Sequence, residues 1–290
     1  GGLGAQSMAV FTNNSGFTTV DANVAGVVTI SNAADTLTTV RNTLTGGSIV
    51  FTRLVDGTGN SLTVEADDSA ATSQGITTFV AITANDEETI SMVSGSNAAE
   101  DLTITTLNAS DLTTLNMSGT ADATVTTLAG ATKIATVTAT GLTGKATVDA
   151  GVSTVAMTMT AGAGGSEFTA SDLADTLTGG AGVDTLTGGS GSDTITGGAG
   201  NDIFKFDTIT DSSGNTKDTI TDFKQSTLNA TTGAQITNGD SISLVVTSGA
   251  VADGNTTSFI LSDKGDVANA GEAVNAMNNS SGSFVFAKDN

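Results

Sequence analysis

The chain has 290 residues, a formal net charge of -21, and no His, Cys, Pro, Trp or Tyr. Without His or Cys it lacks the residues for Ser-His-Asp or Cys-His catalysis, for imidazole or thiolate metal sites, and for disulfides. Its nine basic residues are scattered singly, which argues against nucleic acid or an anionic membrane as a partner. Multivalent cations are the natural counterpart of such an acidic chain, although acidity can also serve solubility alone.

Residues 1–100 are expected to be β-rich. β-prone runs lie at 26–31 (GVVTIS), 48–55 (SIVFTRLV), 61–66 (SLTVEA) and 77–84 (TTFVAITA), and polar turn segments part them. These strands either continue a solenoid with the rest of the chain or form a separate sandwich, and the first arrangement is favoured. The adjacent Glu87 and Glu88 would face opposite ways on a strand, so we interpret them as solvated turn charges rather than an acid/base pair.

Residues 101–160 form a Thr- and Ala-rich series of short strands. The runs LTITTL, LTTLNMS, ATVTTL, IATVTAT, KATVDA and VAMTMT recur about every ten residues, with Gly, Ser, Ala and Asp between them. Thr alternates with an apolar residue at period two, as a strand with one buried face requires. Two such runs make about twenty residues, which is a plausible coil of a parallel β-solenoid.

Residues 161–205 fall into nine-residue units, which read AGAGGSEFT, ASDLADTLT, GGAGVDTLT, GGSGSDTIT and GGAGNDIFK. The last three fit G-G-x-G-x-D-x-U-x, where U is a large apolar residue. The apolar residue at position eight (Leu186, Ile195 and Phe204) is expected to point inward. A flexible glycine-rich linker has no reason to keep an apolar residue in every ninth place, so the pattern predicts a β-roll.

The turn residues of these units have the chemistry of a calcium site. Glycines at positions one, two and four allow positive φ and turn carbonyl oxygens into the space between turns. With the Asp at position six they make an all-oxygen cage of the kind that Ca²⁺ prefers. Turn n is expected to stack on turn n+2, so Asp184 faces Asp202 and Asp175 faces Asp193. Because two carboxylates so close repel each other, folding is expected to depend on a bound cation.

These units resemble the RTX (repeats-in-toxin) family of type I-secreted bacterial proteins, firmly over residues 161–223 and loosely beyond. The resemblance implies a parallel β-roll, several Ca²⁺ ions in its turns, and export by an ABC-transporter channel with an uncleaved C-terminal signal. It implies one ion held by Gly180, Gly182 and Asp184 with Gly197, Ala199 and Asp202, and a second held by Ser171, Leu173 and Asp175 with Gly188, Ser190 and Asp193.

Two departures from the family pattern affect the first units. Ser166 stands where the first unit would have an Asp, and Ala170 and Ser171 replace glycines in the second. The turns that end the repeats need partners after Phe206, and these are either Asp207, Asp218 and Asp222 or none, if those three are ordinary solvated turn acids. The predicted metal-site residues are Ser171, Leu173, Asp175, Gly179, Gly180, Ala181, Gly182, Asp184, Gly188, Gly189, Ser190, Gly191, Asp193, Gly197, Gly198, Ala199, Gly200, Asp202, Asp207, Asp218 and Asp222.

Residues 206–290 are expected to cap the roll. The run NGDSISLVV predicts a strand, and residues 266–279 predict the one short helix of the chain, with Asp266 available as its N-cap. The ending SFVFAKDN looks like the short apolar end of a type I secretion signal. The sequence therefore predicts an all-β protein in which a parallel β-solenoid leads into an RTX β-roll and a C-terminal cap.

The order of these parts resembles the C-terminal part of surface-layer (S-layer) proteins of type I-secreting proteobacteria. We therefore predict an extracellular structural protein at the bacterial cell surface, with copies of itself in a lattice or fibre, cell-surface polysaccharide and the type I secretion apparatus as partners. The alternatives are an RTX adhesin or a glycan- or ice-binding module, against which the drifting coil spacing argues, and the calcium-binding tail of a secreted RTX enzyme. No catalytic residue is predicted, and no apolar run is long enough to enter a membrane.

Overall fold

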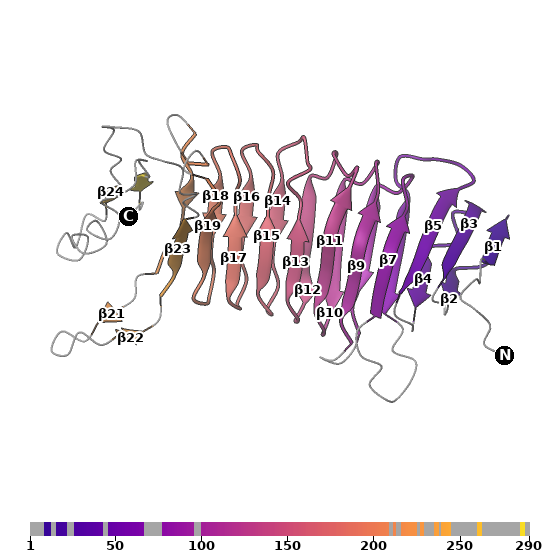
Figure 1. Ribbon diagram of the computed structural model, residues 1–290, viewed down its shortest axis with the longest axis horizontal. Coiled ribbons are helices and arrows are strands. Elements are labelled where there is room, and N and C mark those ends of the chain that lie inside the picture. Colours follow the sequence, from indigo (N-terminus) through magenta and orange to yellow (C-terminus); the bar gives the residue numbers. More distant parts are fainter. Residues whose placement is uncertain are drawn as a thin grey trace.

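The computed structural model describes residues 9–12, 16–21, 26–42, 46–66, 77–95, 100–208, 211–212, 216–224, 227–228, 235–237, 239–244, 260–262 and 285–287. All regular elements among them are β-strands, and two long parallel sheets run the length of an extended solenoid (Figure 1). The predicted all-β, parallel solenoid is therefore confirmed.

The 11-stranded sheet, here called sheet A, consists of β1 (Ala9–Thr12), β3 (Val27–Ala33), β5 (Gly47–Arg53), β7 (Thr77–Thr83), β9 (Leu102–Asn108), β11 (Ala123–Ala129), β13 (Ala146–Asp149), β15 (Ser166–Thr169), β17 (Asp184–Thr187), β19 (Ile203–Phe206) and β23 (Ser241–Leu244). The 10-stranded sheet, sheet B, consists of β2 (Thr19–Asp21), β4 (Thr39–Asn42), β6 (Ser61–Ala66), β8 (Thr89–Val93), β10 (Thr114–Gly119), β12 (Thr136–Leu142), β14 (Thr158–Thr160), β16 (Thr176–Thr178), β18 (Thr194–Thr196) and β20 (Thr219–Ile220).

Every neighbouring pair within these two sheets is parallel, because the chain alternates between the sheets and adds one strand to each per coil. Two short pairs lie outside them. β21 (Thr227–Leu228) pairs antiparallel with β22 (Gln235–Thr237), and β24 (Ile260–Ser262) pairs parallel with β25 (Val285–Ala287).

The core is the thin layer between the two sheets. Period-two alternation sends every second side chain inward, and the same position stacks from coil to coil. In sheet A, Phe168 lies in register with Leu186, and Leu186 with Phe204, and all three are fully buried. In sheet B, Ile195 lies in register with Leu177, and both side chains are buried. The inward direction predicted for the apolar residue at position eight is therefore confirmed.

The strands expected from the sequence between residues 26 and 160 are all present, within a few residues at their ends. Four strands of residues 1–100 were not predicted, namely β1, β2, β4 and β8. Strands from residues 1–100 lie in the same two sheets as the nine-residue units, and neither sheet is interrupted near residues 100, 160 or 205. The helix predicted at 266–279 lies outside the described residues, as does the C-terminal ending apart from the backbone of β25.

Within the described residues no helix has the length and apolar character needed to cross a membrane.

The outer face of sheet B carries two ranks of small polar side chains. Strand pairing aligns Thr89, Thr114, Thr136, Thr158, Thr176, Thr194 and Thr219 in one rank, and Ser91, Asn116, Thr138, Thr160, Thr178 and Thr196 in the other. The Thr196 and Thr221 hydroxyls lie 2.7 Å apart, which extends the second rank. Coil length drifts as the sequence indicated, but strand pairing keeps both ranks aligned despite this drift.

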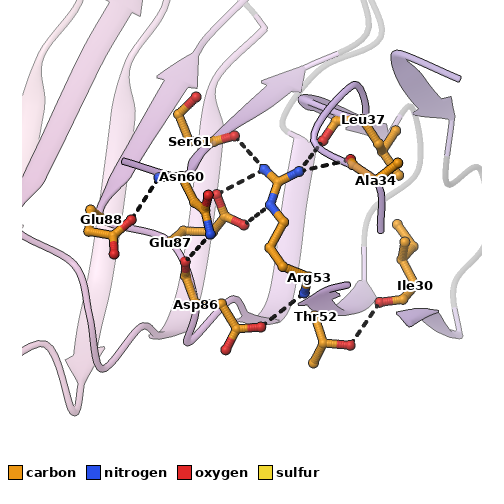
Figure 2. A network of polar contacts seen from close by, with 10 residues as sticks. All are labelled: Ile30, Ala34, Leu37, Thr52, Arg53, Asn60, Ser61, Asp86, Glu87 and Glu88. Atoms are coloured by element: carbon orange, nitrogen blue, oxygen red, sulfur yellow. Dashed lines mark hydrogen bonds and ion pairs between the residues drawn. The ribbon is translucent and has the colours of Figure 1, made fainter. Parts of the chain in front are cut away.

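A buried ion pair lies inside the N-terminal coils (Figure 2). The Arg53 guanidinium donates to both Glu87 carboxylate oxygens, at 2.6 and 3.0 Å, and to the carbonyl oxygens of Ala34, Leu37 and Ser61 at 3.1, 2.8 and 2.7 Å. The side chains of Arg53 and Glu87 are 2% and 0% exposed. The interpretation of Glu87 as a solvated turn charge is therefore wrong, because its carboxylate is buried and is the counter-ion of Arg53.

Candidate metal centre

Close stacking of main chain on main chain explains the glycines of the nine-residue units. A Cβ on Gly180 would lie 1.6 Å from the carbonyl oxygen of Gly162, so no side chain fits there. Gly198 has φ +94°, and a Cβ there would lie 2.3 Å from the Gly180 oxygen. Positive φ was expected at positions one, two and four, but five of these glycines lie outside the left-handed region and are required by space alone: Gly179, Gly180, Gly182, Gly188 and Gly197.

Two buried stacks of polar residues, all of them acidic except Ser166, run along the edges of the roll. The Asp184 stack comprises Ser166, Asp184, Asp202 and Asp240, each at the start of, or just before, a strand of sheet A. The Asp193 stack comprises Asp175, Asp193 and Asp218, each just before a strand of sheet B. All seven residues are buried. Each coil of the roll therefore begins its strands with an enclosed polar residue.

Hydrogen bonds join each stack from coil to coil. The backbone N–H of Asp184 donates to Asp202 Oδ1 at 3.0 Å, and that of Asp175 donates to Asp193 Oδ1 at 2.8 Å. The Ser166 hydroxyl donates to Asp184 Oδ1 at 2.7 Å, so this serine takes the place of the first acid. The stacking of turns 18 residues apart, which the nine-residue period predicted, is present in the structure.

The structure brings together both ligand sets that the family resemblance implied. In the first set, the Gly180 carbonyl oxygen accepts a hydrogen bond from the Ala199 N–H at 2.9 Å. The Gly182 carbonyl oxygen lies 2.1 Å from the position that a Cβ on Gly200 would occupy. In the second, the carbonyl oxygens of Ser171 and Leu173 lie 2.2 and 2.4 Å from the positions that a Cβ would occupy on Gly189 and Gly191. The carbonyls of each turn thus point into the space between stacked turns. The remaining predicted residues, Ala181, Gly188, Ser190 and Gly197, lie in the same turns.

The three acids proposed to follow Phe206 behave differently. Asp218 Oδ1 accepts the Asp193 N–H at 2.9 Å and so extends its stack. Asp222 accepts the N–H groups of Gly197 and Gly198, each at 2.7 Å, with its two oxygens. The Asp207 carboxylate instead pairs with Lys205 at 2.7 Å and joins neither stack.

Sequence reasoning missed Asp240, whose Oδ1 accepts the Asp202 N–H at 3.0 Å. It also missed Asp211, which accepts the N–H groups of Asp207 and Thr208 at 2.8 and 2.9 Å. A signal was available for Asp240, because the triplet Asp240-Ser241-Ile242 repeats the Asp-x-apolar order of Asp184-Thr185-Leu186.

Burial of these carboxyl groups changes their protonation. Burial raises the pKa of Asp193 to about 8, and the charges of Asp218 and Asp175 add to the rise. Burial raises the pKa of Asp218 to about 6, with the charge of Asp211 adding to it. Burial also raises the pKa of Asp175, Asp184 and Asp202, against hydrogen bonds that lower it. In the absence of a cation, the stacks therefore favour bound protons.

This protonation predicts a pH dependence for the calcium-free protein. A carboxyl whose pKa is higher in the folded state than its value of 3.8 when unperturbed stabilises the fold at low pH, and that contribution is lost as pH rises through the folded pKa. We therefore expect the melting temperature in calcium-free buffer to fall between about pH 4 and pH 8. Thermal unfolding followed by circular dichroism measures this. With saturating Ca²⁺ the trend should vanish or reverse, because the ion competes with protons. A calcium-free melting temperature that is equal or higher at pH 8 would contradict the assignment.

The stacks fit a hard divalent cation. Asp193 Oδ2, Asp202 Oδ2 and Asp218 Oδ2 are buried without a hydrogen-bond partner, which is costly unless another group satisfies them. Among the described residues no three acidic, His or Cys side chains gather as a metal cluster, so carboxylates supply only part of any ligand shell. The carbonyl oxygens between the turns can supply the rest, and such an all-oxygen donor set matches Ca²⁺.

Comparison with known proteins agrees with this chemistry. Residues 169–204 match the family model of the RTX calcium-binding nonapeptide repeat, in four copies. No curated protein matches the chain. The matched residues contain Asp175, Asp184, Asp193 and Asp202, which are the repeat acids of the two stacks. The chain therefore contains RTX calcium-binding nonapeptide repeats over residues 169–204, and these repeats form the β-roll.

Proposed function

We propose that this protein is a structural component of the bacterial cell surface, which assembles with copies of itself into an S-layer lattice or a fibre under the control of Ca²⁺. The observation that carries the proposal is the unbroken solenoid, in which both sheets extend from β1 and β2 into the acid stacks (Figure 1). Such a rod presents two long sheet faces to neighbours. RTX repeat proteins are generally secreted, and calcium is plentiful outside the cell.

Charge explains why calcium would control assembly as well as folding. The chain has a formal net charge of -21, so copies of it repel one another when no counter-ion is bound. Exposed acids such as Asp35, Asp122 and Asp172 remain available after the stacks are filled. Calcium bridging such acids on neighbouring copies would remove this repulsion. Cell-surface polysaccharide is the proposed anchor, the type I secretion apparatus the export route, and no catalytic role is proposed.

Assembly is tested by electron microscopy and light scattering on the full chain, first in EGTA and then in millimolar Ca²⁺. Ordered sheets or fibres that form with calcium and dissolve in EGTA are expected. Magnesium at equal concentration is the control for simple charge screening. Protein that binds calcium and folds but stays monomeric at high concentration would overturn the lattice proposal without touching the calcium sites.

A second candidate function is an adhesin that binds a neutral, regularly repeating surface such as glycan or ice. The observation that favours it is the pair of ranks on sheet B, from Thr89 to Thr219 and from Ser91 to Thr196, which contain no charged residue. The strands of sheet B from β8 to β20 contain no charged residue, which is unusual on so acidic a protein. Aligned hydroxyls repeat at the strand spacing of about 4.7–4.9 Å, which suits a periodic ligand. High β-propensity of Thr is the alternative explanation.

The two candidates separate in a binding assay with insoluble cellulose, amylose and growing ice crystals. Thr176→Lys places a charge in the first rank of sheet B, and Thr126→Lys places one at an exposed position of sheet A. If the adhesin candidate is correct, the first variant loses binding and the second keeps it. Absence of binding by the unaltered chain to all three surfaces would reject this candidate.

A further inference from the structure

Two acids from outside the nonapeptide repeats complete the two stacks. Asp218 lies opposite Asp193 and Asp240 lies opposite Asp202, and they are 6% and 7% exposed. In the repeats, facing acids are 18 residues apart, whereas these pairs are 25 and 38 residues apart. The intervening chain is therefore longer in both pairs than in the repeats, and each time it ends with an acid at the position that a repeat would have supplied.

These segments rebuild the turn as well as the acid. The N–H of Lys224 donates to Asp240 Oδ2 at 2.7 Å, and the N–H of Asp240 donates to the Lys224 oxygen at 2.7 Å. In the repeats the corresponding bond is made within one turn, as from the N–H of Gly180 to Asp184 Oδ2 at 2.8 Å. The same hydrogen bond from a backbone N–H to an Asp Oδ2 thus forms between Lys224 and Asp240, although β21 and β22 lie between them in the sequence.

Unpartnered oxygens occur where these acids meet the roll. The Oδ2 atoms of Asp175 and Asp184, earlier in the stacks, each accept an N–H from their own turn. By contrast, the Oδ2 atoms of Asp193, Asp202 and Asp218 are buried and accept no hydrogen bond. The Oδ2 atoms of Asp193 and Asp202 lie 2.2 and 2.5 Å from the positions that a Cβ would occupy on Gly188 and Gly197, so they point into their own turns. Buried carboxylate oxygens of this kind require a cation or a proton.

We propose that the roll has two further calcium sites beyond its repeats, one between Asp193 and Asp218 and one between Asp202 and Asp240. The carbonyl oxygens of the same turns would complete each shell, as in the repeats. This inference rests on the calcium binding in the proposed function and deepens it. Because β20 and β23 follow Asp218 and Asp240 directly, ions at these sites fasten the last strands of both sheets to the roll.

The two sites differ in one neighbouring charge. The Lys224 ammonium donates a hydrogen bond to the Gly198 carbonyl oxygen, in the turn that ends with Asp202. A cation already held at that oxygen opposes a second one by Coulomb repulsion. The Lys224 side chain is exposed and can leave without disturbing the core. We therefore expect the site between Asp202 and Asp240 to bind calcium more weakly than the site between Asp193 and Asp218.

The test is the number of calcium ions bound per chain, measured by equilibrium dialysis and by isothermal titration on the full chain. Asp218→Asn and Asp240→Asn keep the size of the side chain and its oxygen acceptor but remove the charge. Each is expected to lose one ion relative to the unaltered protein. Asp149→Asn, at the exposed end of strand β13, is the matched control and should keep every ion. Unchanged ion number and affinity in both stack variants would overturn the two sites.

Hydrogen exchange on the unaltered chain gives a second readout that needs no variant. The N–H of Ser241 in β23 donates to the Asp202 oxygen at 2.7 Å, and that of Thr219 in β20 donates to the Asp193 oxygen at 2.7 Å. Both amides should be protected with calcium and exchange fast without it. Equal protection in both conditions would contradict the inference. If the repeats bind calcium but the two variants lose no ion, this inference alone fails, whereas a chain that binds no calcium at all rejects the proposed function as well.

Discussion

Replacing Arg53 by methionine is expected to lower the free energy of unfolding by about 3–5 kcal/mol, because it leaves the Glu87 carboxylate buried without its counter-ion. All five guanidinium N–H groups of Arg53 are used, two on Glu87 and three on main-chain carbonyl oxygens. The substitution therefore also deprives Ala34, Leu37 and Ser61 of a donor. Urea unfolding in saturating Ca²⁺, followed by far-ultraviolet circular dichroism, measures the loss.

Arg41→Met is the matched control for this experiment. Arg41 pairs with Glu65 at 2.5 Å, but their side chains are 39% and 25% exposed, so this substitution should cost less than about 1 kcal/mol. Burial already raises the pKa of Glu87 against the opposing effect of Arg53. Without Arg53 that pKa rises further, so the Arg53→Met variant should lose more stability at pH 8 than at pH 5. Equal losses for the two arginine variants would show that the buried pair does not stabilise the N-terminal coils.

Gly180→Ala is expected to destabilise the roll by about 1–3 kcal/mol or more, the cost of overfilling a well-packed site. The new Cβ would lie 1.6 Å from the oxygen and 2.8 Å from the carbon of the Gly162 carbonyl. These are backbone atoms of the stacked coil, so they cannot move aside as a flexible side chain would. The same shift would displace the Gly180 carbonyl, so weaker calcium binding should accompany the loss. Urea unfolding and calcium titration together measure both effects.

Gly59→Ala is the control for that substitution. Nothing lies within 4 Å of a Cβ at Gly59, and its φ lies outside the left-handed region. This variant should be neutral or slightly stabilising, since alanine reduces the freedom of the unfolded chain. If Gly180→Ala unfolds at the same urea concentration as Gly59→Ala, the coils of the roll do not approach each other as closely as described.

Local rules were enough to predict the repeat part of the fold. Each nine-residue unit contains its own turn glycines, its acid and its apolar residue, so the stacking of Asp184 with Asp202 follows from the period alone. The same period-two logic placed the strands between residues 26 and 160 except β4 and β8. The period-two pattern also contained a signal for Arg53, which was not used. Arg53 lies an even number of residues after the buried Ile49 and Phe51, so the pattern predicts that its side chain points inward.

The closing acids could not be predicted with the same certainty, because the longer intervening chain breaks the period. The order Asp-x-apolar occurs at Asp218 and Asp240, which join the stacks, but also at Asp207 and Asp35. Asp207 pairs with Lys205 instead, and Asp35 lies exposed in a turn. Only the path of the folded chain distinguishes Asp218 and Asp240, which join the stacks, from Asp207 and Asp35, which do not. The partner Glu87 of Arg53 was missed for the same reason, since 34 residues separate them.

The central claim is that calcium holds the acid stacks together, and hydrogen exchange measured with and without Ca²⁺ tests it most directly. We predict that amides between residues 157 and 224, including those of Asp175, Asp184 and Asp193, lose protection when calcium is removed. Amides of β5 to β9, which close on the apolar core and the Arg53–Glu87 pair, should keep theirs. Equal protection of residues 157–224 in both conditions would contradict the account, because a roll that needs no ion would have another way to satisfy its buried carboxylates.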